Sequence, residues 1–176
     1  FKGRGVSHCA SCDAPLLRDQ VVAVVGGGDS ALQESLTLAE AASKVIVLQK
    51  GPALTAQAAY RARVESHPKI ELRFNVTVEA IVGDTAMTGV RTAEGVIDAA
   101  GVFIYVGFAP NTAYLNGKVK LDSAGRIPTD SMMRTELAGL FAAGSVRAGW
   151  PGRAVASAGD GATAAIAADD YLKRSV

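Results

Sequence analysis

Cysteine, histidine and tryptophan are scarce in this sequence, and long apolar segments are absent from it. The 176 residues contain two Cys, two His and one Trp, too few thiols for a framework of several disulfides. No apolar run approaches the roughly 20 residues of a membrane-spanning helix, and no signal peptide is visible. We therefore expect neither a membrane protein nor a small secreted domain held together by disulfides.

An excess of either charge is also missing. Lys and Arg number 18 and Asp and Glu 17, so the net charge of +1 gives no electrostatic argument for binding nucleic acid or a membrane. With 49% apolar and 20% charged residues, the composition is typical of a soluble globular protein of one domain or a domain and a half. The first residue is Phe1 rather than Met, and the sequence starts inside a motif, so we interpret it as part of a longer protein.

Strand-like and helix-like segments alternate along residues 1–110. The continuous apolar run Val21–Val25 is typical of a buried parallel strand, and residues 29–42 place apolar side chains along one face of a helix. There follow a strand over 44–48, a helix over 53–66, a strand-like stretch over 71–82, a meander over 86–99 with turns at Gly89 and 94–95, and a strand over 101–106. This order predicts an α/β, Rossmann-like three-layer nucleotide-binding domain with an inserted β-meander.

The character of the sequence changes from Pro110 onward. Residues 111–128 are rich in turn-forming residues, residues 140–143 indicate a short strand, and the Ala-rich residues 153–172 predict one helix. We find no internal repeat and no low-complexity linker.

A glycine-rich turn joins the first strand to the first helix. It reads Gly26-x-Gly28-x-x-Ala31, in which the first glycine permits a tight turn and the second lets a pyrophosphate approach the backbone. A helix that starts near Asp29, which we expect to be its N-cap, would direct free N–H groups at the phosphates. We prefer dinucleotide binding to an ordinary βα turn and assign to it the residues Gly26, Gly27, Gly28, Asp29, Ser30 and Ala31.

The two cysteines form a Cys-x-x-Cys pair, Cys9 and Cys12, just ahead of the first strand. The spacing allows a disulfide, and such pairs commonly contain one activated thiol. The alternatives are a zinc half-site with His8 or two inert thiols; zinc needs four ligands, and His67 is the only further Cys or His in the sequence. A dithiol beside a dinucleotide turn favours electron transfer between a nicotinamide and the dithiol, and this cysteine usage suggests the cytoplasm.

Four motifs in a fixed order carry a family resemblance. They are residues 3–13 (GRGVSHCASCD), the glycine turn, residues 105–112 (YVGFAPNT) and residues 139–144 (GLFAAG). With them the sequence resembles thioredoxin reductase of the low-molecular-weight, bacterial type, nearly from end to end. That family has an NADPH domain and an FAD domain, and the FAD domain is split, with one half before the cysteines and the other at the end of the chain.

The resemblance implies a division of this sequence and a role for each part. Residues 1–110 would form the NAD(P)H-binding domain with the redox dithiol, and residues 111–176 the C-terminal part of the FAD-binding domain, whose N-terminal part is absent from the sequence. Cys12 would take electrons from the flavin, Cys9 would attack the disulfide of a thioredoxin-like protein, and Asp13 would protonate the leaving thiolate. The implied cofactors are NADPH and FAD, and the full-length protein would be a homodimer.

The second strand ends differently from the family pattern. The family usually has His-Arg-Arg at the positions of Gln49, Lys50 and Gly51, so only Lys50 keeps a cation. Arg61 and Arg63 lie on the next predicted helix and could compensate, and no Asp or Glu stands at the end of the strand to favour NADH. A point-charge Lys holds a phosphate less well than an Arg fork. We therefore expect NADPH to bind through Lys50, with a weak preference over NADH.

The C-terminal segment also departs from the family pattern. Ser145 replaces the Asp that binds a flavin ribityl hydroxyl, which removes a charge-assisted hydrogen bond. Gly152 and Arg153 replace an Arg and a Gln that approach the flavin. The candidate cofactor-binding residues of the 105–112 motif and the C-terminal segment are Gly107, Gly144, Ser145, Arg153, Ala154 and Val155.

Three hypotheses about function remain open at this point. The first is an NADPH-dependent, thioredoxin-reductase-like flavoprotein, to which these residues contribute the nucleotide site and the dithiol. The second is a degenerate or isolated dinucleotide-binding module without disulfide reductase turnover, favoured by Ser145 and the lost arginines. The third is a related flavin reductase that acts on something other than thioredoxin.

Overall fold

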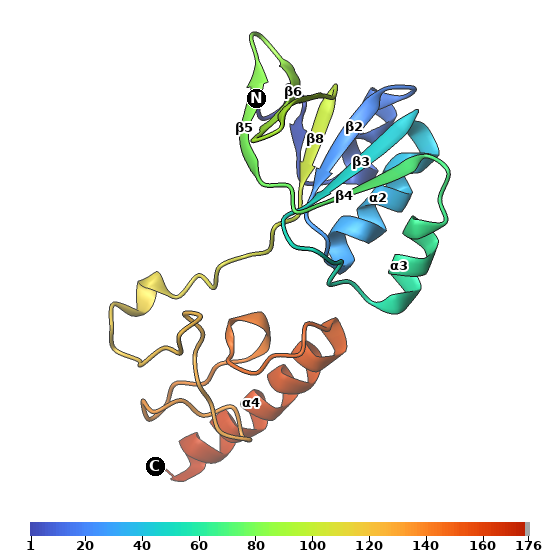
Figure 1. Cartoon of the computed structure of the whole chain (residues 1–176). Helices are drawn as coiled ribbons and strands as arrows, with labels where there is room; N and C mark the ends of the chain where they lie inside the picture. The colour runs from blue at the N-terminus through green and yellow to red at the C-terminus, as the bar shows by residue number, and fades with distance from the viewer. Residues whose placement is uncertain (175–176) are drawn as a thin grey trace. The chain divides into compact units, whose positions relative to one another are not determined.

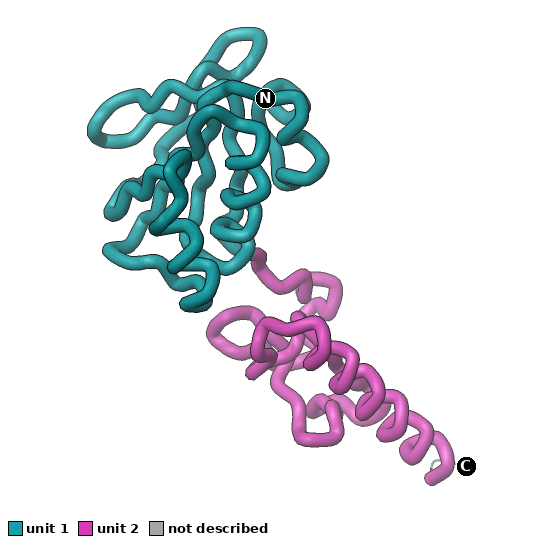
Figure 2. The backbone as a smooth tube through the Cα atoms, turned by 90° about the vertical axis from the view of Figure 1, so that its right-hand side faces the viewer, with its two compact units in different colours: residues 1–107 teal, residues 108–176 magenta. Residues whose placement is uncertain are grey.

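The computed structural model describes residues 1–174, and the chain divides into two compact units, residues 1–107 and residues 108–176 (Figure 2). None of the helices in the described part of the chain is long and apolar enough to cross a membrane.

The first unit is built on a five-stranded parallel sheet with the strand order β1-β8-β2-β3-β4 (Figure 1). The strands are β1 Val6–Ser7, β2 Val21–Val25, β3 Lys44–Gln49, β4 Ile70–Phe74 and β8 Gly101–Ile104. From β2 the chain first adds strands on one side, β3 and then β4, and later adds β8 on the other side. The direction of sheet growth therefore reverses at β2 and β8, and in such sheets ligands bind at the carboxyl ends of the strands beside this reversal.

Helices cover one face of the parallel sheet (Figure 1). They are α1 Ala10–Asp13, the 3-10 helix η1 Ala14–Leu17, α2 Asp29–Ala41 and α3 Ala58–Glu65. Alternate strand residues such as Val22, Val47 and Phe103 are fully buried in the core between sheet and helices. Continuous apolar strands are expected in a parallel sheet covered on both faces, which is the situation here.

A second, antiparallel sheet covers the other face and consists of β5 Val78–Gly83, β6 Met87–Thr92 and β7 Gly95–Asp98, in the order β5-β6-β7. The intervening strand residues Ala23, Ile46 and Val102 pack with Met87 and Val90 of this sheet in a separate buried cluster. Helices, parallel sheet and meander thus form three layers. The predicted α/β, Rossmann-like fold with an inserted meander is confirmed.

The structure corrects several predicted boundaries in the first unit. The helix expected over 53–66 begins only at Ala58, because the backbone N–H groups of Thr55 and Ala56 donate to the Gly27 carbonyl and hold the preceding loop against the glycine turn. The stretch expected as one strand over 71–82 is two strands in different sheets, β4 and β5, separated by Asn75 with φ of 59°.

Gly89 was expected in a turn but lies inside β6. A Cβ at this position would come within 2.6 Å of the carbonyl oxygen of Ile97 on the neighbouring strand. The glycine is therefore required by the close approach of β7, which a sequence pattern cannot distinguish from a turn.

The second unit has little regular structure apart from one long helix. It contains the 3-10 helices η2 Ala113–Leu115 and η3 Gly144–Val146 and the helix α4 Ala154–Arg174, which matches the predicted Ala-rich helix closely. The strand expected over 140–143 is reduced to one antiparallel bridge between Phe141 and Arg134. A small apolar cluster forms around Val119, Ile127 and Ala142.

Candidate nucleotide and disulfide site

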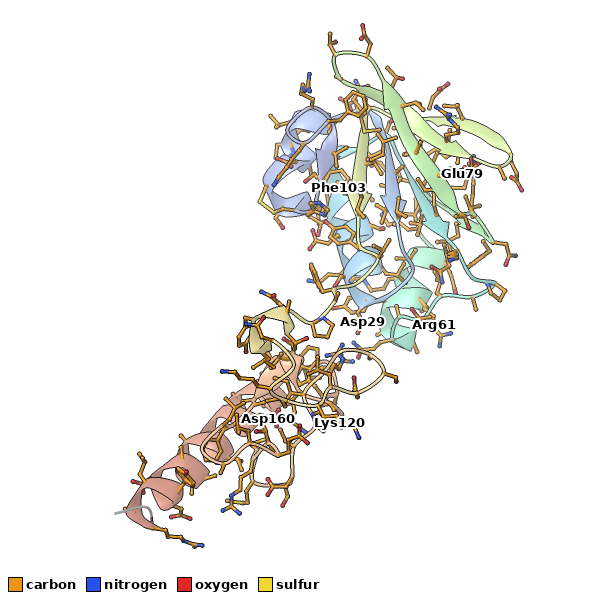
Figure 3. All side chains as sticks on the ribbon, turned by 90° about the vertical axis from the view of Figure 1, so that its left-hand side faces the viewer. Asp29, Arg61, Glu79, Phe103, Lys120 and Asp160 are labelled. Atoms are coloured by element: carbon orange, nitrogen blue, oxygen red, sulfur yellow. A yellow bond between two sulfur atoms is a disulfide. The ribbon has the colours of Figure 1, made fainter. Side chains whose placement is uncertain are left out.

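Cys9 and Cys12 are joined in a disulfide, with their Cα atoms 5.3 Å apart (Figure 3). The disulfide joins Cys9, the N-cap residue of the short helix α1, to Cys12 within that helix. The Cys12 N–H points at Cys9 Sγ at 3.2 Å. Asp13 ends the same helix, and its N–H donates to the Cys9 carbonyl at 3.2 Å. The zinc half-site with His8 does not form in this state, because both sulfurs are used by the disulfide and the His8 ring Nδ1 lies 3.2 Å from the Ile104 carbonyl oxygen.

Side chains from two neighbouring elements fix the disulfide turn. Ser7, at the end of β1, accepts a hydrogen bond from the Cys9 N–H at 3.1 Å. Glu34 on α2 accepts one from the Ala10 N–H at 2.9 Å, and the Tyr105 hydroxyl lies 3.4 Å from the same Glu34 oxygen. Burial, followed by the charge of Glu34, raises the pKa of Tyr105 to about 12. Tyr105 therefore remains a hydrogen-bond donor throughout the neutral range.

Two of the three glycines in the turn have opposite surroundings. Gly26 adopts φ of 127°, and a Cβ there would come within 2.3 Å of the Tyr105 carbonyl oxygen. Gly28, the N-cap of α2, has an ordinary φ of −89°, and the nearest atom to a Cβ there would be Thr55 Oγ1 at 3.7 Å. Gly26 thus serves the fold, whereas a Cβ on Gly28 would meet only the Thr55 hydroxyl, at ordinary contact distance. A pyrophosphate that approached the free N–H groups of α2 would pass this side of Gly28.

The remaining residues assigned to the turn take distinct positions. Ala31 is fully buried and would lie 3.5 Å from a Cβ on Gly26, so the close packing of helix and strand tolerates a methyl group here. Gly27 is buried under the Gln49 side chain, and Ser30 is exposed. The expectation that Asp29 caps the helix is wrong. Asp29 is the first helical residue, and its carboxylate accepts hydrogen bonds of 2.7 Å from both the backbone and side-chain nitrogens of Gln57.

The residues expected to recognise a 2′-phosphate are all exposed. Lys50 directly follows β3, while Arg61 and Arg63 lie on α3, whose N-terminal side is fixed to α2 by the Asp29–Gln57 hydrogen bonds. Figure 3 labels Asp29 and Arg61 in this region of the first unit.

Tyr105 connects the two turns. Tyr105 directly follows β8, and its carbonyl oxygen packs against Gly26 of the glycine turn. Its hydroxyl contacts Glu34, which in turn accepts a hydrogen bond from Ala10 of the disulfide turn. Both turns therefore stand at the carboxyl edge of the same parallel sheet, beside the point where the direction of sheet growth reverses.

The second unit holds most of the residues assigned to flavin binding. Gly144 adopts φ of 73°, and its N–H donates to Asp160 on α4 at 3.1 Å. Asp160 also receives two hydrogen bonds from Arg147, at 2.9 and 3.1 Å, and this guanidinium lowers the pKa of the carboxyl. Ser145 is exposed, and its carbonyl accepts a hydrogen bond from Arg126.

The start of α4 presents its backbone at the surface. Ala154 and Val155 are the first helical residues and are exposed, with Val155 80% exposed; Arg153 precedes them. Gly107, the last residue of the first unit, is exposed with φ of 95°. An exposed hydroxyl and a helix N-terminus are suitable donors for a polyol or phosphate group, so the residues present fit part of a flavin nucleotide.

Sequence reasoning missed Glu34, Tyr105 and Asp160. Glu34 is 24 residues from Ala10, and Tyr105 is 71 residues from Glu34, so no local spacing could have paired them. For Asp160 a signal did exist in the sequence, since it stands apart from Asp169 and Asp170 in the Ala- and Gly-rich first part of the helix; the structure shows it 8% exposed. A buried acid in such a segment calls for a cationic partner.

A disulfide turn and a glycine-rich βα turn on one edge of a Rossmann-like sheet are typical of the class of nucleotide-linked disulfide oxidoreductases. The chain belongs to the pyridine nucleotide-disulphide oxidoreductase family, whose model matches residues 1–161.

Two named groups of proteins are similar to it. The thioredoxin reductase of Treponema pallidum (strain Nichols) is 41% identical over 98% of this chain and 58% of the relative. An NADH dehydrogenase of Bacillus subtilis (strain 168) is 36% identical over 99% of this chain and 36% of the relative. The crystal structure of Lactococcus lactis thioredoxin reductase is similar with a TM-score of 0.92 and 34% identity, over 99% of this chain and 60% of that one. The chain thus spans little more than half the length of the thioredoxin reductases it matches.

Proposed function

We propose that the chain supplies the nicotinamide nucleotide site and the redox disulfide of a thioredoxin-reductase-like flavoprotein. Electrons would pass from NADPH, by way of FAD, to the Cys9–Cys12 disulfide and on to a disulfide of a thioredoxin-like protein. The observation that carries this proposal is the placement of both turns on one sheet edge with Tyr105 between them. The 41% identity to a thioredoxin reductase supports the same reading.

The nucleotide is held by the glycine turn and α2. Gly28 leaves room for the pyrophosphate, and the N–H groups of the first turn, including those of Ser30 and Ala31, meet its charge. The loop over residues 50–57 is fixed to Gly27 by two backbone hydrogen bonds, which preorganises the side of the site that carries Lys50. Lys50 would contact the 2′-phosphate of NADPH.

The disulfide accepts two electrons and two protons, which break the Sγ–Sγ bond and leave two thiols. Cys9 Sγ already faces the Cys12 N–H, an arrangement that stabilises a thiolate on Cys9 after reduction. Cys9 would then attack the partner's disulfide and form a mixed disulfide, with Asp13 giving a proton to the leaving sulfur. Attack by Cys12 on the mixed disulfide would release the reduced partner and re-form the Cys9–Cys12 bond.

The second unit would hold FAD through the Ser145 hydroxyl and the start of α4 at Arg153, Ala154 and Val155, next to Gly144. FAD, when bound, supplies the step between a two-electron hydride donor and a disulfide. Residues 1–110 would then be the NAD(P)H domain, and residues 111–176 the C-terminal part of the FAD domain. We also propose that the full-length protein is a cytoplasmic homodimer.

The test measures NADPH oxidation through the change in absorbance, with a thioredoxin-like protein disulfide as the electron acceptor. We expect no turnover from the 176-residue chain, with or without added FAD, and turnover from a longer protein that also contains the N-terminal half of the FAD domain. Turnover by the 176-residue chain without flavin would contradict the mechanism. Failure of the longer protein with bound FAD would contradict the reductase assignment.

A second candidate is a dinucleotide-binding module without reductase turnover. Ser145 favours it, since this exposed hydroxyl stands where the thioredoxin reductase pattern has a carboxylate that binds the flavin. Flavin absorbance of the purified protein distinguishes the two, because a module that binds only a nicotinamide nucleotide stays colourless.

A further inference from the structure

The disulfide turn depends on its neighbours for its position. α1 has four residues, far fewer than a helix needs to be stable by itself. Ala10, its first residue, is 0% exposed and packs into the core beneath the helices. The Ala10 N–H donates to Glu34 Oε2 at 2.9 Å, a charge-assisted bond between α2 and the backbone between the two cysteines.

Tyr105 fixes Glu34 in turn. Its hydroxyl, 3.4 Å from Glu34 Oε2, is the donor in this contact because a carboxylate can only accept. The hydroxyl also interacts with the Ala10 backbone and is raised in pKa to about 12, chiefly by burial, so it does not ionise under physiological conditions. Tyr105, Glu34 and Ala10 therefore form a chain of contacts from the end of β8 to the disulfide.

The charged groups that face this turn are mainly acidic. They are Asp13 on α1 and Glu34 on α2, with the neutral Tyr105 hydroxyl between α2 and the end of β8. The adjoining helix η1 (Ala14–Leu17) has no ionisable side chain, and the His8 ring at the end of β1 contacts the Ile104 carbonyl. The charge of Glu34, which reaches the turn through its bond to the Ala10 N–H, opposes the stabilisation of a thiolate that the Cys12 N–H provides.

We propose that Glu34 and Tyr105 are positioning residues of the redox disulfide, which hold the cysteine turn in its closed form after reduction and keep its reduction potential low. The biological meaning rests on the proposed reductase function, but the physical effect does not. When the Sγ–Sγ bond is reduced to two thiols, the Glu34–Ala10 hydrogen bond remains and keeps the sulfurs close. Without it the reduced turn gains conformational freedom, and reclosure becomes less favourable.

The measurement is the equilibrium of the 176-residue protein with dithiothreitol. Two thiol–disulfide exchanges convert Cys9–Cys12 to two thiols and dithiothreitol to its cyclic disulfide; acid quenching, alkylation and mass spectrometry give the ratio. For Glu34→Ala we expect about a tenfold shift towards the dithiol, equal to a potential about 30 mV less negative. Tyr105→Phe should shift the ratio about two- to threefold in the same direction, the amount expected for one weak hydrogen bond.

Two further variants separate position from charge. Glu34→Gln keeps a hydrogen-bond acceptor for Ala10 but removes the negative charge, so it should raise the rate of iodoacetamide alkylation of the reduced protein at neutral pH by several-fold. Gln33→Ala is the matched control, since Gln33 is exposed on the same helix and contacts Tyr60 rather than the disulfide turn. Its equilibrium and alkylation rate should equal those of the wild type.

Wild-type ratios in both Glu34→Ala and Tyr105→Phe would overturn the proposal, as would an equal shift in Gln33→Ala. Circular dichroism verifies folding, and if Glu34→Ala does not fold, a wild-type ratio in Tyr105→Phe alone overturns the proposal. No nucleotide, flavin or protein partner enters these assays. A protein that proves inactive as a reductase can therefore still confirm the positioning role, and an active one can still refute it.

Discussion

Replacing Gly28 by valine should separate nucleotide binding from folding. The backbone of Gly28, with φ of −89° and ψ of −178°, is accessible to any residue, and a Cβ there meets nothing closer than Thr55 Oγ1 at 3.7 Å. We therefore expect the fold to accommodate valine and its methyl groups to block the approach to the α2 N-terminus. A pyrophosphate held by the N–H groups of that helix would be displaced.

The two expected magnitudes differ in a measurable way. Loss of a set of charge-assisted contacts to the phosphates weakens NADPH binding by at least about 2–3 kcal/mol, which is about 30- to 150-fold. Replacement of an N-cap glycine by a β-branched residue costs at most about 1 kcal/mol of stability, a decrease in melting temperature of about 4–8 °C for a unit of roughly 100 residues. Titration calorimetry and thermal unfolding by circular dichroism give the two quantities separately.

Gly26→Ala is the matched variant in the same turn, with the opposite expectation. Its φ of 127° is strained for alanine, and the added Cβ would lie 2.3 Å from the Tyr105 carbonyl oxygen, so the backbone has to move. We expect a loss of about 2 kcal/mol or more in unfolding free energy. Equal NADPH affinity in wild type and Gly28→Val would refute the reasoning and place the nucleotide elsewhere. So would a Gly26→Ala protein as stable as the wild type.

Four other measurements test the remaining conclusions. NADPH should bind less than about tenfold more tightly than NADH, since one exposed Lys–phosphate contact is worth about 1 kcal/mol or less; Lys50→Glu should reverse the preference, and an unchanged ratio would exclude Lys50 as its source. Alkylation of the oxidised, folded protein should modify Cys9 and Cys12 only after reduction; full labelling beforehand would contradict the redox role. The pKa of the Asp160 carboxyl is lowered in the folded protein, so its contribution to folding stability is complete above the ordinary pKa of 3.8 and is lost as the pH falls through the folded pKa. Asp160→Asn lacks this contribution, so it should unfold in acid at a higher pH than the wild type. The pKa of Tyr105 is raised from 10.0 to about 12, so its contribution to folding stability is complete below pH 10 and is lost as the pH rises towards 12. Tyr105→Phe should remove this part of the loss of stability in alkali, and an identical dependence of stability on alkaline pH in mutant and wild type would exclude a role for Tyr105.

The sequence predicted the layered fold because its signals are local. The run Val21–Val25 and the glycines at 26 and 28 specify a buried strand and a turn by themselves, and the structure has β2 and the start of α2 where these signals place them. The Cys-x-x-Cys spacing likewise predicted the disulfide, which is present.

The errors arose where distant contacts decide local structure. Residues 53–57 have helix-forming side chains, yet Leu54 and Ala56 are buried and the backbone is hydrogen-bonded to Gly27, so tertiary contacts override propensity. Asp29 has the chemistry of an N-cap but instead bonds Gln57, a partner 28 residues away. The roles given to Lys50, Ser145 and the start of α4 stay predictions, because they concern groups that lie outside the protein.

The two-residue strand β1 has a consequence for the order in which the chain can fold during synthesis. Within the parallel sheet β1 pairs only with β8, whose residues 101–104 leave the ribosome about 95 residues after it. Until then neither β8 nor Tyr105 is available to contact residues 6–13, and only Glu34 and the core around α2 can hold the turn that carries both cysteines. In this topology the thiols are synthesised well before β8 and Tyr105 complete their surroundings, so a nascent chain would pass through an interval in which pairing with other thiols competes with formation of the Cys9–Cys12 disulfide.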